Sequence, residues 1–248
     1  MVLRKILEDI FKFNIQMFIQ VLTPKSLSIL GSVFPFLSVV AGWIVYYSLG
    51  HNTPGVLLTI SETVIPFPEC RIFAVTMNME VIFLYMLYTI RNNAISTLAR
   101  EKGIILGIKK VILILCKYVN ILGLSITSWI TLKEFDVLHF SAAGFFFMGS
   151  LIYYVVSDMC LAQVGHPVPQ ISHAITITIP IFLVLYSVVC TQFQFSDHNF
   201  MRSMGALFQY IYCFLLFTRI FLFQYDLPKN AYGTIWGDVN SLSEQISH

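Results

Sequence analysis

Apolar residues occur in long runs along this chain, and short polar segments separate one run from the next. A helix of about 20 apolar residues crosses the hydrocarbon core of a membrane. The pattern predicts six such helices, at about residues 27–49, 71–91, 110–132, 139–163, 173–194 and 203–224. The predicted fold class is therefore all-α, with one six-helix transmembrane domain over residues 27–224 and no second domain.

The two ends of the chain differ from this domain. Residues 3–21 place apolar groups at helical spacing and charged groups on the other side, which predicts an amphipathic helix lying in the membrane interface within segment 1–26. A disordered tail that only looks amphipathic is the alternative. Residues 225–248 are predicted to form a polar tail.

Residues Gly50–Phe73 form the longest segment that is neither strongly apolar nor rich in charge. Pro54, Pro66 and Pro68 prevent regular helix there, because proline lacks the backbone N–H that a helix needs. The segment still contains many Val, Leu and Ile side chains together with hydrogen-bonding groups. We therefore expect an ordered loop that folds back over the end of the bundle and caps it.

Composition and charge agree with a membrane protein and give it an orientation. The chain is 57% hydrophobic and 11% charged, whereas a soluble domain has about 25% charged residues. Ten Lys and Arg residues fall on the side of the two termini and three on the other side. The positive-inside rule predicts cytoplasmic termini and a lumenal or extracellular first loop. No basic tract interleaved with aromatic residues suggests a nucleic-acid partner.

Four charged residues lie within predicted spans, where charges are costly and face the bundle interior. Opposite signs at similar depth predict two intramembrane charge pairs, Glu80 with Lys117 and Asp158 with Arg219. We favour a structural role in fixing helix register over a proton or ion relay.

Candidate catalytic and metal-binding chemistry is sparse. The chain contains no GxSxG, HExxH or Walker motif. His51, His139 and His198 could hold zinc, but their spacing does not place two of them on one helical face, so no metal and no cofactor is predicted. Glu62 with His51 could support acid–base chemistry; we favour a capping role for both.

Several short motifs resemble one known family. In the loop they are Gly50-His51-x-x-Pro54, Ile60-Ser61-Glu62, Pro66, Pro68 and Cys70-x-Ile72-Phe73; in the spans they are Leu122–Ile126, His139-x-Ser141-x-Ala143 and Met148–Leu151. Together they resemble the DRAM family, the damage-regulated autophagy modulators, within a wider superfamily that includes Sfk-type proteins and post-GPI-attachment lipid-remodelling factors. Departures from the family pattern are Thr63, where some relatives carry a cysteine, and Gln209-Tyr210 and Asp226-Leu227 in place of Glu-Trp and Asp-Phe.

The resemblance implies a lysosomal, endosomal or plasma-membrane protein that promotes autophagy without an established catalytic activity. Our leading hypothesis is a non-enzymatic modulator that binds lipid or a partner protein in a notch beneath the first loop. The candidate ligand-binding residues of cap and notch are His51, Pro54, Ser61, Glu62, Cys70, Phe73, His139 and Ser141.

Two alternatives from other functional classes stay open. The first is a lipid-remodelling factor or acyl-transfer enzyme of the GPI or phospholipid type, in which His139 and Glu62 would be catalytic. The second is an ion or proton-coupled transporter, which rests on Glu80 and Lys117 alone. The expected partners are membrane lipids, with proteins of autophagy or lipid signalling also considered. The expected compartment is the lysosomal or endosomal membrane, with the plasma membrane, Golgi or ER as alternatives.

Overall fold

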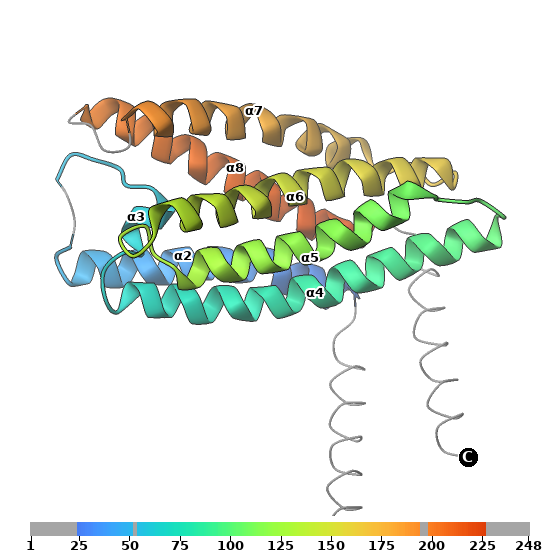
Figure 1. Cartoon of the computed structure of the whole chain (residues 1–248), viewed down its shortest axis with the longest axis horizontal. Helices are drawn as coiled ribbons and strands as arrows, with labels where there is room; N and C mark the ends of the chain where they lie inside the picture. The colour runs from blue at the N-terminus through green and yellow to red at the C-terminus, as the bar shows by residue number, and fades with distance from the viewer. Residues whose placement is uncertain (1–23, 52–53, 194–197, 227–248) are drawn as a thin grey trace, which may run out of the picture.

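A computed structural model describes residues 24–51, 54–193 and 198–226, and every secondary-structure element in this part of the chain is a helix. The helices are α2 (Pro24–Ser48), α3 (Ile60–Thr63), α4 (Glu69–Glu101), α5 (Ile108–Trp129), α6 (Asp136–Gln163), α7 (Gln170–Phe193) and α8 (Asn199–Asp226). Six are long and apolar enough to cross a membrane (Figure 1), which confirms the six-span prediction. The amphipathic segment and the polar tail lie outside the described residues, apart from a few at their inner edges.

Glycines end two of the long helices. Gly103 after α4 and Gly165 after α6 have φ angles of +64° and +69°, a region that favours glycine. After Gly103, the Ile104 amide donates to the Ala99 carbonyl at 2.8 Å. After Gly165, the His166 amide donates to the Leu161 carbonyl at 2.9 Å. This arrangement satisfies carbonyl groups that the last helical turn leaves without partners.

α4 and α8 extend beyond the predicted spans. α4 continues ten residues past position 91, to Glu101, and α8 ends at Asp226 rather than at 224. The reason is visible in α4, whose buried positions continue at helical spacing through Arg91, Ile95 and Ala99. Hydropathy marks the end of a span at its first charges, whereas the helix continues as long as one side packs against its neighbours.

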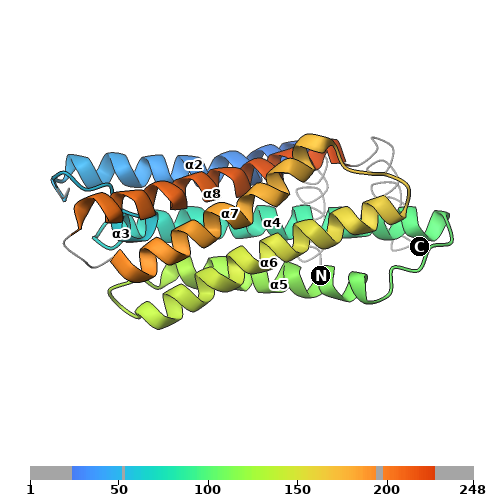
Figure 2. The ribbon, with the colours of Figure 1, turned by 90° about the horizontal axis from the view of Figure 1, so that it is seen from above.

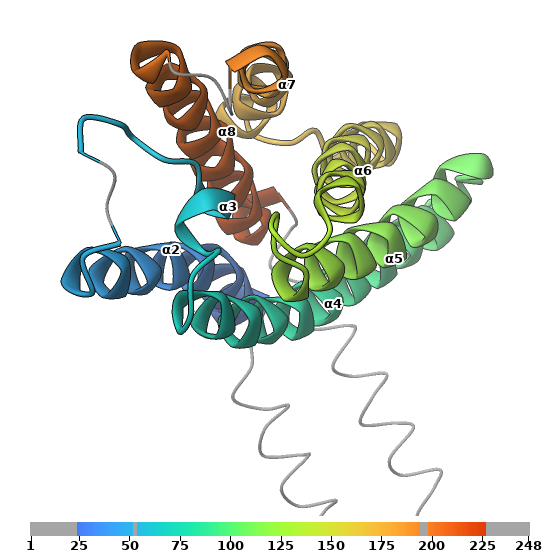
Figure 3. The same ribbon diagram turned by 60° about the vertical axis from the view of Figure 1, so that its left-hand side comes forward.

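The six long helices pack as an open ring. Close packing runs in the order α6, α5, α4, α2, α8 and α7, whereas α6 and α7 make few contacts with each other. Figure 1 shows α7 diverging from α6 toward the end of the bundle where α3 lies. Figure 2 shows α2 and α8 along one long edge and α5 along the other, and Figure 3 shows α3 over the middle of the ring.

The α5–α6 contact is the closest in the ring. A Cβ atom added to Gly123 would lie 2.7 Å from the carbonyl oxygen of Ala142 and 2.8 Å from the backbone nitrogen of Phe146. Any larger residue at 123 would therefore push the two backbones apart. This contact holds α6 against α5, and the opening of the ring lies between α6 and α7.

Large apolar side chains cover the outside of the bundle. Leu37, Ile82, Leu122, Phe145 and Ile181, one on each of five helices, are between 52% and 63% exposed. A water-soluble monomer rarely exposes so large a continuous apolar surface. This surface faces the lipid.

Candidate functional site

We call residues 49–68 the lid, and the end of the bundle that carries them the lid end. A capping box orders the centre of the lid at α3. The Thr59 side chain accepts a hydrogen bond from the Glu62 amide, and the Glu62 carboxylate accepts from the Thr59 amide and hydroxyl at 2.8 Å each. Reciprocal bonds of this kind satisfy the free amides at a helix start. They hold Ser61, which lies between the two, in a fixed position.

α8 anchors the lid through three hydrogen bonds to the lid backbone. The Ile60 amide donates to the side-chain oxygen of Gln209 at 2.7 Å, and the Leu57 amide donates to the Ser203 hydroxyl at 3.0 Å. The Tyr210 hydroxyl donates to the Leu58 carbonyl at 2.9 Å. These bonds confirm the expected ordered loop and place it across the end of the ring.

A cavity of about 1030 Å³ lies beneath the lid. Its walls come from α2, α6, α7 and α8, with smaller contributions from the lid, α4 and α5, and they are largely aliphatic and aromatic. None of the described residues that line it is Asp, Glu, Lys or Arg. Met148 on α6 and Val184 on α7 line the cavity and are also 49% and 60% exposed, so the cavity reaches the outer surface where these helices diverge.

Ser61 and His139 meet at the lid end of this cavity. The Nε2 atom of His139 lies 3.0 Å from the Ser61 hydroxyl, and its Nδ1 atom lies 2.5 Å from the carbonyl oxygen of Ile130. His139 is 2% exposed. This contact joins the lid to α6, and Phe73 at the start of α4 lines the same cavity.

The connection between α5 and α6 presents the Ile130 carbonyl to His139. Thr131 and Glu134 brace this connection: the Glu134 carboxylate accepts from the Thr131 amide at 2.9 Å and from its hydroxyl at 3.1 Å. These two hydrogen bonds, that from the backbone amide first, hold the pKa of the exposed Glu134 carboxyl below its usual value. The brace sits directly beside Ile130 and so fixes the position of its carbonyl.

Other residues proposed for the notch lie elsewhere. Glu62 turns away from His139 and pairs with Arg202 at 3.1 Å, and His51 lies 2.8 Å from Glu69. Pro54, Cys70 and Ser141 are absent from the cavity lining, and Ser141 is exposed on the outer side of α6. Glu62 and His51 therefore have separate partners, and the histidine contact of α3 is made by Ser61 and not by Glu62.

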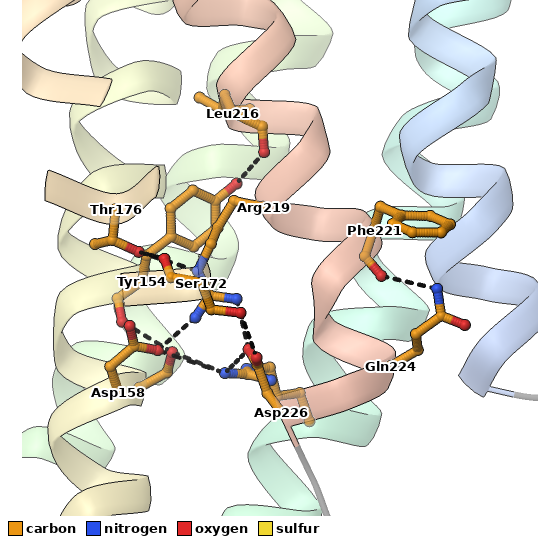
Figure 4. A network of polar contacts seen from close by, with 11 residues as sticks. Tyr154, Asp158, Ser172, Thr176, Leu216, Arg219, Phe221, Gln224 and Asp226 are labelled. Carbon is orange, nitrogen blue, oxygen red and sulfur yellow. Dashed lines mark hydrogen bonds and ion pairs between the residues drawn. The ribbon is translucent and has the colours of Figure 1, made fainter. Parts of the chain in front are cut away.

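Four charged residues form a compact group at the opposite end of the bundle, which we call the charge network: Arg91, Asp158, Arg219 and Asp226. Arg219 contacts both carboxylates at 2.5 Å, and Arg91 lies 3.1 Å from Asp226 and 3.7 Å from Asp158. Ser172 and Thr176 of α7 add hydrogen bonds (Figure 4). The Asp158–Arg219 pair is confirmed, and it has two further partners, Arg91 at the end of the second predicted span and Asp226 in the predicted tail.

The predicted pair of Glu80 and Lys117 is wrong. Both carboxylate oxygens of Glu80 are buried, and neither has a hydrogen-bond partner among the residues that the structure describes. Lys117 lies 3.3 Å from the Thr89 hydroxyl and about equally close to the rings of Tyr85 and Tyr118, at 4.7 and 4.6 Å. Similar depth in the bundle did not bring the two together, because the rotation of each helix about its axis points them to different neighbours.

The structure adds residues that sequence analysis did not select as site residues. Gln209, Tyr186, Tyr210 and Trp43 all line the cavity near the lid. The Thr-x-x-Glu spacing of the capping box was a readable signal for the start of α3. In the sequence, Gln209-Tyr210 stands out only as a departure from the family pattern. Its role as a lid anchor depends on contacts with Ile60 and Leu58, which are far away in the chain.

No three His, Cys, Asp or Glu side chains of the described residues are grouped so that they could hold a metal ion. Of the three histidines considered as zinc ligands, His51 contacts Glu69 and His139 contacts Ser61. Both contacts are hydrogen bonds of a kind that structural or acid–base groups make.

The fold and the cavity define a class: a polytopic helical membrane protein with an ordered lid over an intramembrane cavity. A family model described as Frag1/DRAM/Sfk1/Cwh43P N-terminal domain matches residues 25–230, and the chain belongs to this family. The match confirms the resemblance at the level of the superfamily. Comparison with curated proteins gave no match, and comparison with solved structures gave none either.

Proposed function

We propose that this protein binds an acyl-chain lipid of the membrane leaflet nearest the lid, and that the cavity beneath the lid is the binding site. The observation that carries the proposal is the cavity itself, at about 1030 Å³. Ligand sites of proteins commonly measure about 300–1,000 Å³ and combine apolar walls with a few placed polar groups. The cavity has this character and lies within the membrane domain.

The distribution of polar groups supports a lipid over a soluble metabolite. Ser61, His139, Gln209 and Tyr210 cluster at the lid end, whereas the deeper lining is apolar. A lipid has the same division, with one polar end and one apolar end. The exposed lining residues of α6 and α7 give such a molecule lateral access from the bilayer.

Orientation and cellular role complete the proposal. We place both termini in the cytoplasm and the lid in the lumen, because ten Lys and Arg residues of the sequence fall on the terminal side of the spans and three on the other side. In line with the family resemblance, the protein acts as a modulator of endolysosomal membranes in autophagy. Tagged protein should co-localise with lysosomes, and its loss should alter autophagic flux on starvation; unchanged flux would contradict this part.

Lipid binding is tested by photocrosslinking. Full-length protein in phosphatidylcholine nanodiscs that contain a diazirine-bearing phosphatidylcholine should crosslink at lining residues of α6 and α7. Ala143→Trp fills the cavity from α6 and should lower crosslinking about tenfold, which corresponds to about 1.4 kcal/mol. Ala162→Trp, an exposed position at the far end of the same helix, is the matched control. Equal crosslinking in both variants would overturn the proposal.

A further inference from the structure

We infer that Ser61 and His139 are the nucleophile and the general base of an acyl-transfer site that acts on an ester-linked lipid held in the cavity. The inference rests on the proposed lipid binding and goes beyond it, since it makes the bound lipid a substrate. It starts from the 3.0 Å contact between the Ser61 hydroxyl and His139 Nε2. Serine is a weak nucleophile by itself and is activated by an adjacent base within hydrogen-bond reach.

The tautomer of His139 follows from its second contact. A backbone carbonyl only accepts hydrogen bonds, so the Nδ1 atom that lies 2.5 Å from the Ile130 carbonyl carries the proton. In the neutral ring Nε2 then has a free electron pair, and the Ser61 hydroxyl donates to it. This is the arrangement in which a histidine removes the proton of a serine, with a carbonyl in the orienting role that a carboxylate has in Ser-His-Asp triads.

Rigid surroundings hold the two side chains in this geometry. The capping box fixes α3 on both sides of Ser61, and the Thr131–Glu134 brace fixes the loop that presents the Ile130 carbonyl. Catalytic groups accelerate a reaction most when supporting contacts already hold them in the productive geometry. Burial of His139 keeps water from competing for Nε2.

Donors for the developing negative charge also line the cavity. The Gln209 side-chain amide donates to the Tyr186 hydroxyl at 3.4 Å, and both residues line the cavity together with Ser61. Side-chain amides and hydroxyls of this kind stabilise the oxyanion of acyl transfer. Gln209 is held by its bond to the Ile60 amide, one residue before Ser61.

The reaction proceeds in two balanced steps. Ser61 Oγ attacks the carbonyl carbon of the lipid ester while its proton moves to His139 Nε2. The ester C–O bond breaks, and the same proton passes from Nε2 to the departing alkoxide, which leaves as an alcohol. A water molecule or the hydroxyl of a second lipid then attacks the acyl-Ser61 ester, again giving its proton through His139, and restores Ser61.

The competing explanation is structural: the Ser61–His139 bond could simply hold the lid to α6. A reactivity assay on the folded protein separates the two. An alkyl fluorophosphonate phosphonylates activated serines, and the site is mapped by peptide mass spectrometry. Full-length protein in phosphatidylcholine nanodiscs should be modified at Ser61, Ser61→Ala should not be modified, and His139→Gln should react about 10²–10⁴-fold more slowly.

Two controls distinguish chemistry from lid loosening. Ser141→Ala changes an exposed hydroxyl outside the cavity, and Ser203→Ala removes a lid anchor on α8 that does not touch the pair. Ser141→Ala should react at the unmodified protein's rate, and Ser203→Ala, which loosens the lid but keeps the pair, should react much faster than His139→Gln. Absence of modification at Ser61, or equal rates in His139→Gln and Ser203→Ala, would overturn the inference.

A pH profile gives a second readout. The rate of Ser61 modification should fall as pH drops and His139 becomes protonated, and His139→Gln should remove this dependence together with most of the rate. Lipid crosslinking is measured on the same samples, so the two proposals fail separately. Crosslinking without Ser61 modification would overturn the acyl-transfer inference alone. Modification without crosslinking would overturn the lipid-binding proposal and, with it, the lipid as substrate of Ser61.

Discussion

At the end opposite the lid, four buried charges neutralise one another, whereas at the lid end uncharged hydrogen bonds hold the structure around a large cavity. The charge network joins α4, α6, α7 and α8, with Arg219 between two carboxylates. The lid is held by amide, hydroxyl and imidazole groups, with one partly exposed ion pair at its edge. Both regions are held by polar contacts, but breaking a contact costs much more free energy in the charge network than at the lid.

The difference follows from the energy of an unpaired group. A buried charge that loses its partner is far more costly than a neutral group that loses one hydrogen bond. The network end therefore stays closed, and α6 and α7, which diverge toward the lid, stay joined near the network. At the lid end, α6 and α7 can separate without breaking a pair of the charge network.

The largest effect is expected at Arg219. Arg219→Met leaves Asp158 and Asp226 with Arg91 as their sole cationic partner in the network, so one carboxylate is uncompensated. We expect a loss of about 3–5 kcal/mol of stability, measured by unfolding in detergent. The control Lys110→Met changes an exposed lysine. Equal stability of the two variants would show that the network does not hold the bundle together.

A smaller and more local effect is expected at Gln209. Gln209→Ala removes the acceptor of the Ile60 amide, and an unsatisfied buried amide costs about 1–3 kcal/mol. Hydrogen exchange of lid amides should accelerate while exchange in the α4 core stays unchanged. Leu207→Ala, at an exposed position two residues earlier, provides the comparison. Acceleration throughout the bundle would contradict a local role.

The ion pair at the edge of the lid should contribute less still. Arg202 and Glu62 are 23% and 11% exposed, and pairs of this kind contribute about 0–1 kcal/mol. Arg202→Met should therefore lower the unfolding temperature slightly, and high salt should reduce the difference from the unmodified protein because it screens exposed charges. A loss as large as that of Arg219→Met would remove the contrast between the two ends.

Glu80 should show the smallest effect. Its carboxylate oxygens have no hydrogen-bond partner in the described structure, and burial without a partner favours the neutral acid. Glu80→Gln preserves shape and neutrality, so stability should change by no more than about 0.5 kcal/mol. Asp226→Asn makes the same chemical change within the network and should destabilise clearly. Equal losses would indicate that Glu80 is ionised and paired.

Some residues of the candidate site can be predicted from the sequence, and others cannot for a physical reason. Ser61, His139 and Phe73 line the cavity as expected, because family motifs marked all three. Ser141 does not, because it lies two residues after His139 on α6 and side chains two apart on a helix do not share a face. Gln209 was missed because its acceptor role depends on an amide 149 positions away in the chain.

The number of spans, the proline-rich lid between the first two and the family of the chain were all determined by the sequence alone. These features depend on local composition, since each helix must satisfy its own backbone in the membrane whatever its neighbours are. Only the tertiary structure decided that Arg91 and Asp226 join the charge network, that Glu80 and Lys117 stay apart, and that Ser61 meets His139. Such pairings depend on how each helix is rotated and tilted against the next, and that is set by packing across the whole ring, with close contacts such as Gly123 against α6.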